Sequence, residues 1–441
     1  MKVKKIKIEN FRGILDAELE FDDRLNVFIG RNGAGKTTIL DAIGKCIFDL
    51  IKTFTGESNE NIFNSNDNIN YGARYFLIDS QISTDFHPSL LDIYVHEGYL
   101  NSIEIRESAI DKFFNSLNEI VKTREVTIPI FKYYSRKRNT TYGVVMGKII
   151  KTFPIPQLET WDNIYQDEVT YHKFVKWFFD NESKELRLRR DTKNEKAEIR
   201  TLTYVRKAVQ AALRELEDIN FSIKSDQVKR KYSNDLIPTL VIENLETGVA
   251  EDLNNKSDGE KAIITLVADI AYNLSIAKDF SEGDDYLNSP GIVLIDEIEA
   301  HLHPEWQRKI IPLLTELFPN IQFFITTHSP QVISTVESQH IFIGENFKFS
   351  KINIKSKGLD SNQILKYVFN TTERPREYID LIEQFDQTID NQGDIQELES
   401  IVTKIDALDE GDNGRDIDML IEELNLRIEA YKYDLAHEAH S

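Results

Sequence analysis

The segment Gly30 to Thr38, GRNGAGKTT, combines glycines, a lysine and hydroxyl side chains in a pattern that can hold a nucleotide. It matches the complete P-loop pattern, Gly-x4-Gly-Lys-Thr. In such a loop, backbone N–H groups surround the β-phosphate, the lysine reaches the β- and γ-phosphates, and the hydroxyl ligates Mg²⁺ at a helix N-terminus. The residues expected at the nucleotide are Asn32, Gly33, Gly35, Lys36, Thr37 and Thr38.

Two adjacent carboxylates follow a second apolar strand in the segment GIVLIDEIEAHLHP, which begins at Gly291. Asp296 is placed to join Thr37 in the Mg²⁺ shell. Glu297 is the candidate general base, which would orient and deprotonate an attacking water. A buried strand that ends in two acids has little structural purpose without a cation, so the pair favours nucleotide hydrolysis.

The segment KSDGEKA places Ser257, Gly259 and Glu260 immediately before a predicted helix. A hydroxyl and free N–H groups would then face out of the positive end of that helix, where a phosphate binds well. The same residues also fit an ordinary helix N-cap followed by a glutamate in the first turn. Their position between the P-loop and the paired acids favours the phosphate-binding interpretation.

His328 follows the apolar strand IQFFITT. A histidine at a strand end is often only a satisfied core or surface side chain. In the company of the three motifs above, we expect it to hydrogen-bond a γ-phosphate.

The elements that must position these residues are indicated by hydrophobic periodicity. The apolar strand LNVFIG runs directly into the glycine-rich loop, and a helix with apolar residues at helical spacing follows. A second α/β stretch carries the other motifs, and the last 85 or so residues read as acidic helices. We predict head segments at 1–84 and 235–350, an α/β insertion at 85–234 and a helical C-terminal region at 351–441.

Composition limits the class of protein. The 441 residues are 41% hydrophobic, enough for a large core, and carry a net charge of −21, which opposes non-specific attraction to nucleic acid. The single cysteine, Cys46, excludes an intrachain disulfide and fits a reducing compartment. No signal-like N-terminal region and no run of 18 apolar residues are present, so we expect a cytoplasmic protein without membrane contact.

The ordered set of motifs resembles the ATP-binding-cassette (ABC) head shared by structural-maintenance-of-chromosomes (SMC) proteins, RecF and the overcoming-lysogenization-defect (OLD) nucleases. Gly30 to Thr37 resembles the Walker A motif, Ser257 to Glu260 the signature, Asp296 with Glu297 Walker B, and His328 the switch histidine. The resemblance covers roughly 1–85 and 235–345. It implies an α/β fold, an ABC-type head with a mixed sheet and flanking helices, and ATP with Mg²⁺ as cofactors.

The same resemblance implies a partner subunit and a role for Arg12. The segment IENFRG is similar to the N-terminal strand and turn of these heads, where the arginine lies near the nucleotide. In such heads the signature of one subunit covers the γ-phosphate bound by the P-loop of another. We therefore expect a homodimer or a higher even-numbered oligomer.

Two departures narrow the resemblance. Lys256 stands where a leucine usually precedes the signature serine, and EAHLHP, Glu299 to Pro304, replaces the usual D-loop. The second form is typical of stand-alone ATPases of bacterial anti-phage operons, among them the PtuA-type ATPases of Septu and their retron-associated relatives. It implies a regulator of a separate effector nuclease of the HNH type.

Several other interpretations stay open. Glu299, His301 and His303 with His328 could be drawn as a zinc site, although contacts within a dimer explain them more simply. The acidic pair Asp416 and Asp418 is similar to that of a Toprim nuclease, yet the segment after His328 lacks that fold's strand pattern, so nuclease activity in this chain is not expected. The basic cluster 136–138 is compatible with DNA, and DNA or a phage component is a further candidate ligand.

The C-terminal helices carry apolar stripes at Leu420, Ile421, Leu424 and Ile428, which predict packing either against the head or against a partner protein. We expect the effector nuclease to bind there. The alternative function is a RecF-like ATPase of DNA repair that binds DNA. A transporter ATPase fits less well, because about 220 residues separate Lys36 from Ser257 and only Gln81 could serve as a glutamine loop.

Overall fold

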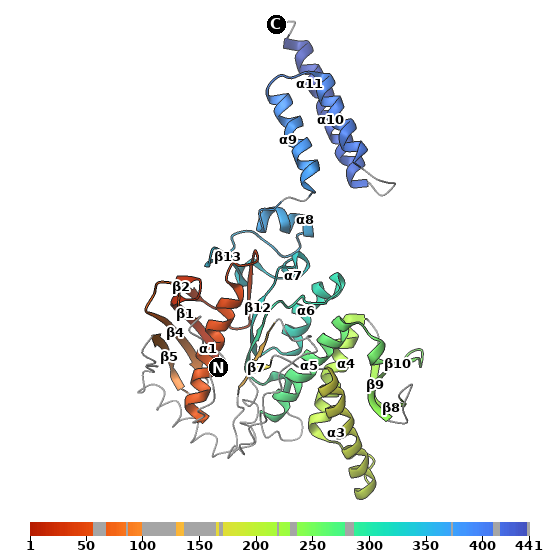
Figure 1. The fold of residues 1–441 in the computed structure, drawn as a ribbon. Coiled ribbons are helices and arrows are strands. Elements are labelled where there is room, and N and C mark those ends of the chain that lie inside the picture. The colour runs from red at the N-terminus through yellow and green to blue at the C-terminus, as the bar shows by residue number, and fades with distance from the viewer. Residues whose placement is uncertain are drawn as a thin grey trace. The chain divides into compact units, whose positions relative to one another are not determined.

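The computed structural model describes residues 1–55, 68–84, 87–98, 129–135, 165–166, 171–217, 220–229, 236–277, 286–371, 374–408 and 415–438. Contacts divide the chain into two compact units, Met1–Ile364 and Leu365–Ser441. The P-loop and the motifs between Ser257 and His328 lie in the first unit, which is drawn in red to light blue in Figure 1.

The first unit is organised around a seven-stranded sheet with the order β14-β13-β3-β12-β11-β6-β7. All neighbours pair in parallel except β13 and β14, which form an antiparallel hairpin. The predicted mixed sheet with flanking helices is therefore confirmed. The strands are β3 (Leu25–Gly30), β6 (Ile130–Tyr134), β7 (Tyr165–Gln166), β11 (Gly291–Ile295), β12 (Ile321–Thr326), β13 (Ile341–Glu345) and β14 (Lys348–Lys351).

The central strands β3, β11 and β12 are buried at every residue. Such strands are mostly apolar rather than alternating, because both faces of a parallel sheet are covered, and Asn26, Gln322 and Thr326 are their buried polar residues. Both β3 and β11 end where a motif begins, so this sheet edge brings the P-loop and the paired acids together.

A second, antiparallel sheet has the order β2-β1-β4-β5. Strand β1 buries Val3, Ile6, Ile8 and Phe11 on the face that packs on the core, and a register shift between Val3 and Lys5 interrupts the two-residue alternation. The strands are β1 (Lys2–Phe11), β2 (Ile14–Glu20), β4 (Tyr75–Thr84) and β5 (His87–Gly98).

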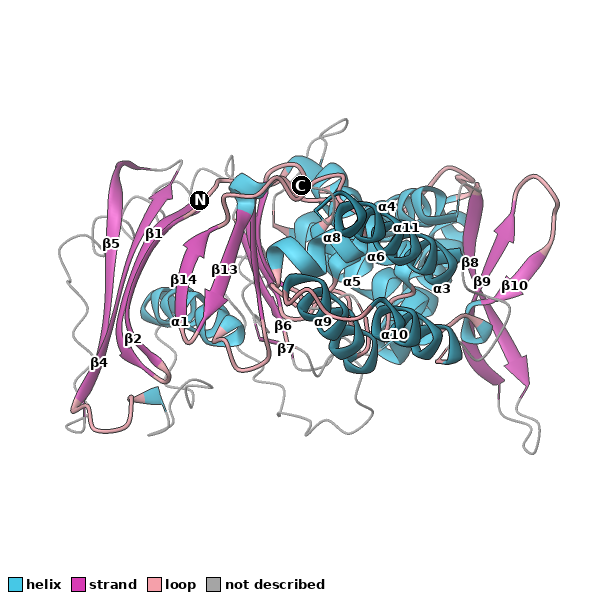
Figure 2. Cartoon of the chain, turned by 90° about the horizontal axis from the view of Figure 1, so that it is seen from above, coloured by secondary structure: helices cyan, strands magenta, loops and turns pink. Residues whose placement is uncertain are grey.

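Helix α1 (Lys36–Thr55) lies between the two sheets and contacts strands of both, as Figure 2 shows. Its apolar residues Ile39, Leu40 and Ile43 are buried in a core that also holds Phe28 and Phe76. This packing fixes the N-terminus of α1, where Lys36 and Thr37 begin the helix, directly after the glycine-rich loop.

The remaining helices of the first unit include α4 and α6, which pack together, and α5, which packs against α3 and α4. A third sheet, β10-β9-β8, contacts α3 and α4. These elements are α3 (Tyr171–Thr192), α4 (Arg200–Glu217), α5 (Asp258–Ile276), α6 (Pro304–Leu317), α7 (Pro330–Ile333), α8 (Ser361–Gln363), β8 (Phe221–Lys229), β9 (Leu236–Asn244) and β10 (Ala250–Asp252).

The predicted insertion at 85–234 is interleaved with the sheets of the segments that flank it. Strand β5 extends the antiparallel sheet by pairing with β4, and β6 pairs with β11 beside the paired acids. The boundaries of the head and the insertion stay a prediction.

The second unit contains α9 (Arg376–Asp390), α10 (Ile395–Ala407) and α11 (Arg415–Glu438). They share a core to which α11 contributes Leu424 and Ile428, with Leu420 and Ile421 partly buried against it. The stripes that predicted a contact with the head or with a partner therefore pack within this unit. They no longer indicate a binding surface.

Within the described residues, no helix combines the length and apolarity required to cross a membrane.

Candidate functional site

The P-loop connects the buried strand β3 to helix α1, as the sequence predicts. Gly30, Gly33 and Gly35 have φ angles of +143°, +81° and +96°, which a residue with a Cβ adopts only under strain. Asn32 and Gly33 are exposed at the tip of the loop, and Thr38 is buried in the first turn of α1. The loop therefore presents its backbone beside the positive end of a 20-residue helix.

Lys36 is only 6% exposed, and its ammonium lies inside the loop. Its Nζ donates to the carbonyl oxygens of Gly30, at 2.9 Å, and Arg31, at 3.1 Å. Burial lowers the pKa of Lys36, while the nearby carboxylates of Glu297, Asp296 and Glu299 oppose that shift. A buried lysine beside a helix N-terminus gives the site a mobile cation for a phosphate chain.

Thr37 and Asp296 come together from α1 and the end of β11. The Thr37 Oγ1 donates to the Asp296 carboxylate oxygens at 3.2 and 3.1 Å, and Asp296 is 4% exposed. A hydroxyl and a carboxylate at this separation are hard oxygen donors that could share one Mg²⁺. Both residues therefore fit the predicted metal role.

Glu297 follows Asp296 in a strained backbone conformation, with a φ of +48°. Thr326, at the end of β12, joins the two acids, because its hydroxyl donates to Asp296 at 2.6 Å and accepts the N–H of Glu297 at 2.8 Å. Non-glycine residues in this region cost free energy and collect at active sites. The positive φ of Glu297 therefore marks it as a candidate functional residue.

His328 connects the P-loop to the paired acids. Its Nδ1 lies 3.2 Å from both the Lys36 Nζ and the Gly30 carbonyl oxygen, and its Nε2 lies 3.6 Å from Glu297. The two contacts of Nδ1 require opposite tautomers, since that atom accepts from lysine but donates to a carbonyl. The tautomer of the imidazole therefore decides whether Nδ1 bonds to Lys36 or to Gly30.

Glu299 holds the backbone of this histidine. Its Oε1 accepts the N–H of His328 at 2.6 Å, while its Oε2 is buried without a hydrogen-bond partner among the described residues. The sequence suggested Glu299 as a residue of dimer contacts or, less simply, as a ligand of a zinc site. The structure places it as a support for His328.

Arg12 lies in the turn between β1 and β2 with a φ of +51°. Its guanidinium forms an ion pair with Asp41 of α1, and its Nε donates to Asn68 at 3.1 Å. Burial raises the pKa of Asp41, although Arg12 and the hydroxyl of Tyr133, at 2.5 Å, stabilise its charged form. Arg12 is thus held on the P-loop helix, and its place near the nucleotide stays a prediction.

The signature residues form a separate site at the N-terminus of α5. Ser257 caps the helix, its hydroxyl accepts the N–H of Glu260 at 3.2 Å, and the Glu260 carboxylate accepts the N–H of Ser257 at 2.7 Å. Burial of Glu260 favours its neutral form, but these bonds and Lys256 outweigh that effect and lower its pKa. The predicted capping box is therefore present, and none of these bonds reaches the P-loop.

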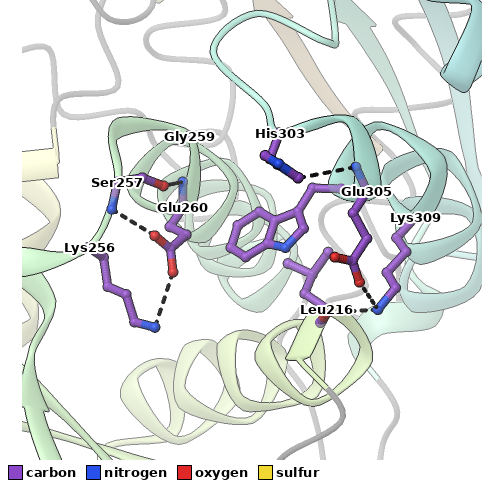
Figure 3. Close-up of a pocket in the computed structure, with 9 residues that line it drawn as sticks. Leu216, Lys256, Ser257, Gly259, Glu260, His303, Glu305 and Lys309 are labelled. Atoms are coloured by element: carbon purple, nitrogen blue, oxygen red, sulfur yellow. Dashed lines mark hydrogen bonds and ion pairs between the residues drawn. The ribbon is translucent and has the colours of Figure 1, made fainter. Parts of the chain in front are cut away.

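Ser257, Gly259 and Glu260 line a cavity of about 460 Å³ with Lys256 and Trp306, and Figure 3 shows it. The other lining residues also come from α4 and from the start of α6, and none belongs to the P-loop. One chain therefore presents the signature and the P-loop as two distinct surfaces.

The segment Glu299 to Pro304, which stands in place of the usual D-loop, packs against the signature. An added Cβ at Gly259 would lie 2.3 Å from the carbonyl oxygen of His301, so this contact requires glycine. His303 caps α6, accepting the N–H of Glu305 at 3.4 Å. No cluster of three or more potential metal-binding His, Cys, Asp or Glu residues occurs among the described residues.

Sequence reasoning missed Thr326 and Asp41. A hydroxyl two residues before His328 was a weak signal for Thr326. Asp41 could not have been paired with Arg12, because 29 residues separate them and only the tertiary fold joins them.

The basic cluster 136–138 lies outside the described residues.

The parallel sheet, the loop between β3 and α1, and the acids at the end of β11 define a P-loop ATPase. The chain belongs to the family described as "AAA domain, putative AbiEii toxin, Type IV TA system", whose model matches residues 25–334.

Relatives that align with most of this chain include proteins named after retrons and after Septu. The "Retron Ec83 probable ATPase" of Escherichia coli is 29% identical in an alignment 440 residues long. The alignment covers 87% of this chain and 79% of that protein. The "Septu protein PtuA" of Bacillus thuringiensis is 24% identical, with 89% and 90% covered. The predicted resemblance to Septu and retron ATPases is thus confirmed. A solved SMC head bound to the C-winged helix domain of ScpA aligns with a TM-score of 0.43 and 12% identity, over 80% of this chain and 98% of that one.

Proposed function

We propose that this protein binds ATP with Mg²⁺ at the P-loop and hydrolyses it with Glu297 as the general base. The carrying observation is the continuous set of contacts from Lys36 through His328 to Glu297, and from Thr37 through Asp296 to Thr326. This set holds a phosphate-binding cation, two oxygen donors for a metal and a carboxylate at one sheet edge.

Each residue has a distinct part in the reaction. Lys36 neutralises the β- and γ-phosphates, and Thr37 with Asp296 would hold Mg²⁺, which supplies charge stabilisation to the transferred group. The oxygen of a water molecule attacks the γ-phosphorus while Glu297 takes a proton from that water. The bond between the γ-phosphorus and the bridging oxygen breaks, and ADP leaves. His328 would contact the γ-phosphate, close to both Lys36 and Glu297.

Glu297→Gln tests this assignment, because it keeps the size of the side chain but removes the base. ATP binding, measured by calorimetry, should stay near the wild-type affinity, while steady-state turnover should fall at least ~100-fold. Glu246→Gln, the same change at an exposed glutamate of the turn after β9, is the matched control and should leave turnover unchanged. A Glu297→Gln protein that hydrolyses ATP at the wild-type rate would mean that another residue is the base.

The proposed active form is a homodimer or a higher even-numbered assembly with ATP between subunits. Support comes from the separation of the signature cavity from the P-loop within one chain. Ser257 and the exposed start of α5 would then meet the γ-phosphate held by the P-loop of another subunit.

We further propose that the protein regulates a separate effector nuclease in bacterial anti-phage defence. Support comes from the Septu and retron names of its relatives and from the charge of the second unit. Residues 365–441 carry 20 aspartates and glutamates against seven lysines and arginines. An acidic unit suits a basic nuclease.

One face of α11 is the proposed contact surface. Met419, Leu426 and Tyr433 are 58, 71 and 63% exposed and recur at seven-residue spacing, which places them on one side of the helix. Glu422 and Glu429 lie between them in sequence. An apolar stripe with acidic neighbours fits a basic amphipathic helix, whereas a second copy would bring like charges together.

The partner surface can be tested by co-purification with the product of a neighbouring HNH nuclease gene. Deleting residues 374–441 should release the nuclease while ATP binding persists, since the unit has its own core. Met419→Ser with Leu426→Ser should do the same. Leu186→Ser with Leu188→Ser, which changes exposed leucines of α3, is the control and should retain the partner. Retention by the truncated chain would exclude the second unit, and DNA binding without any partner would favour the RecF-like alternative.

A further inference from the structure

The hairpin of β13 and β14 has an unusual turn. Glu345 pairs with Lys348, so only Asn346 and Phe347 form the connection, and their φ angles are +47° and +62°. Two-residue hairpin turns of this kind favour Asn-Gly, because glycine adopts a positive φ without a steric penalty. A phenylalanine at the second position is strained by about 1 kcal/mol or more.

The ring of Phe347 lies against two glycines from distant parts of the sequence. A Cβ added at Gly13 would be 2.2 Å from a ring carbon of Phe347, and one added at Gly35 would be 2.6 Å from another. Both glycines therefore leave room that the ring fills. Gly13 follows Arg12 in the turn after β1, and Gly35 is the last glycine of the P-loop.

The same hairpin also touches the start of the P-loop. A Cβ at Gly30 would be 2.4 Å from the carbonyl oxygen of Gly344, the residue of β13 that pairs with it. The loop is thus contacted at its first glycine by the strand and at its last by the tip. Both of these glycines have positive φ angles, so the hairpin packs where the loop conformation is most restricted.

We infer that Phe347 is a positioning residue that holds the P-loop in its phosphate-binding conformation. Lys36 and Thr37 follow Gly35 directly, so a displacement of Gly35 moves both the ammonium and the hydroxyl that meet the phosphates and the metal. A strained turn is retained because its side chain supports the loop. The inference rests on the proposed function, since it concerns the nucleotide at that site.

Phe349 provides a matched control within the same hairpin. It is also a partly buried phenylalanine packed on the same core, with its ring edge-to-face to Phe28 at a centroid distance of 6.0 Å. Its nearest glycine contact is Gly344, in the strand, rather than a residue of the P-loop. Loss of either ring should therefore destabilise the fold, but only Phe347 should affect the nucleotide.

The experiment compares Phe347→Ala, Phe347→Leu and Phe349→Ala for melting temperature, Kd of ATP and GTP with Mg²⁺, and the KM and kcat of hydrolysis. Phe347→Ala should raise Kd and KM about tenfold, a change equivalent to about 1.4 kcal/mol. Phe347→Leu, which keeps an apolar side chain, should recover most of the affinity. Phe349→Ala should lower the melting temperature while Kd stays at the wild-type value.

Phe347→Gly separates loop support from general stability, because glycine relieves the strained turn while removing the ring. It should weaken nucleotide binding even where the protein melts at or above the temperature of Phe347→Ala. ATP and GTP should be affected equally, since the P-loop contacts phosphates rather than the base. An unchanged Kd in the glycine variant, an equal loss in Phe349→Ala, or a loss confined to ATP would overturn the inference. A wild-type chain that binds no ATP would instead refute the proposed function.

Discussion

Thr326 is the residue through which the two acids of the site are coupled. Its hydroxyl donates to the carboxylate of Asp296 and accepts the backbone N–H of Glu297. Because it comes from β12 rather than β11, it ties the catalytic acids to the strand that also leads to His328. It would thereby align the proposed metal ligand, the proposed base and the histidine.

Thr326→Val should keep the shape of this buried residue while removing both hydrogen bonds. Loss of the hydrogen bond to the partly buried N–H of Glu297 should cost about 1 kcal/mol of the free energy of unfolding. ATP turnover should fall more than ATP affinity, because Glu297 loses its orientation. Thr326→Ser should restore turnover. If valine leaves kcat unchanged in steady-state assays, Thr326 has no positioning role.

At the scale of elements, the parts of the site that follow one another in sequence could be predicted. The strand, loop and helix around Lys36 are adjacent, and the apolar strand before Asp296 carries its own signal. The helix start at Ser257 was equally clear from its capping box. Local hydrogen bonding and hydrophobic periodicity determine such features, so one segment is sufficient to recognise them.

Features that join distant segments could not be predicted in the same way. Arg12 meets Asp41 only because β1 and α1 pack together, and Phe347 meets Gly35 across more than 300 residues. The apolar stripes of α11 predicted a contact with the head or with a partner, whereas they pack against α9 and α10. Periodicity shows that a face is buried, but it does not identify the surface that covers it.

The contact between α5 and the replaced D-loop makes an element-scale prediction. In Gly259→Ala, the new Cβ would approach the backbone carbonyl of His301 at 2.3 Å, and backbone cannot rotate aside as a side chain can. The start of α5 must shift, so ATP hydrolysis should fall. The free energy of unfolding should decrease by about 1–3 kcal/mol. Gly248→Ala is the control in a second glycine with open space around it, although its positive φ adds a small strain. Wild-type hydrolysis by Gly259→Ala would show that the contact tolerates a side chain.

At the scale of the whole molecule, two units divide the charge and the chemistry. The first unit carries the P-loop, the paired acids and the signature, while the second carries a separate core and most of the negative charge. This division supports a molecule in which nucleotide binding and partner binding use different surfaces. A variant of the first unit can therefore test ATP hydrolysis without changing the proposed partner surface, and a variant of the second unit can test partner binding without changing the P-loop.

The most direct test of the account mixes two inactive variants. Lys36→Ala removes the phosphate-binding cation but keeps the signature, whereas Ser257→Arg blocks the signature but keeps the P-loop. Each alone should hydrolyse no ATP, and Ser257→Arg should still bind ATP in calorimetry. In a mixed dimer, the P-loop of one chain faces the signature of the other, so one composite site is intact.

An equal mixture should recover about a quarter of the wild-type rate per chain, because half of randomly paired C2 dimers contain one intact site of two. Circular dichroism and size-exclusion chromatography should first show that both variants fold and exchange subunits. Recovery of activity is the result we predict. A mixture that stays inactive under these conditions, or hydrolysis by either variant alone at the wild-type rate, would contradict an ATP site shared between subunits.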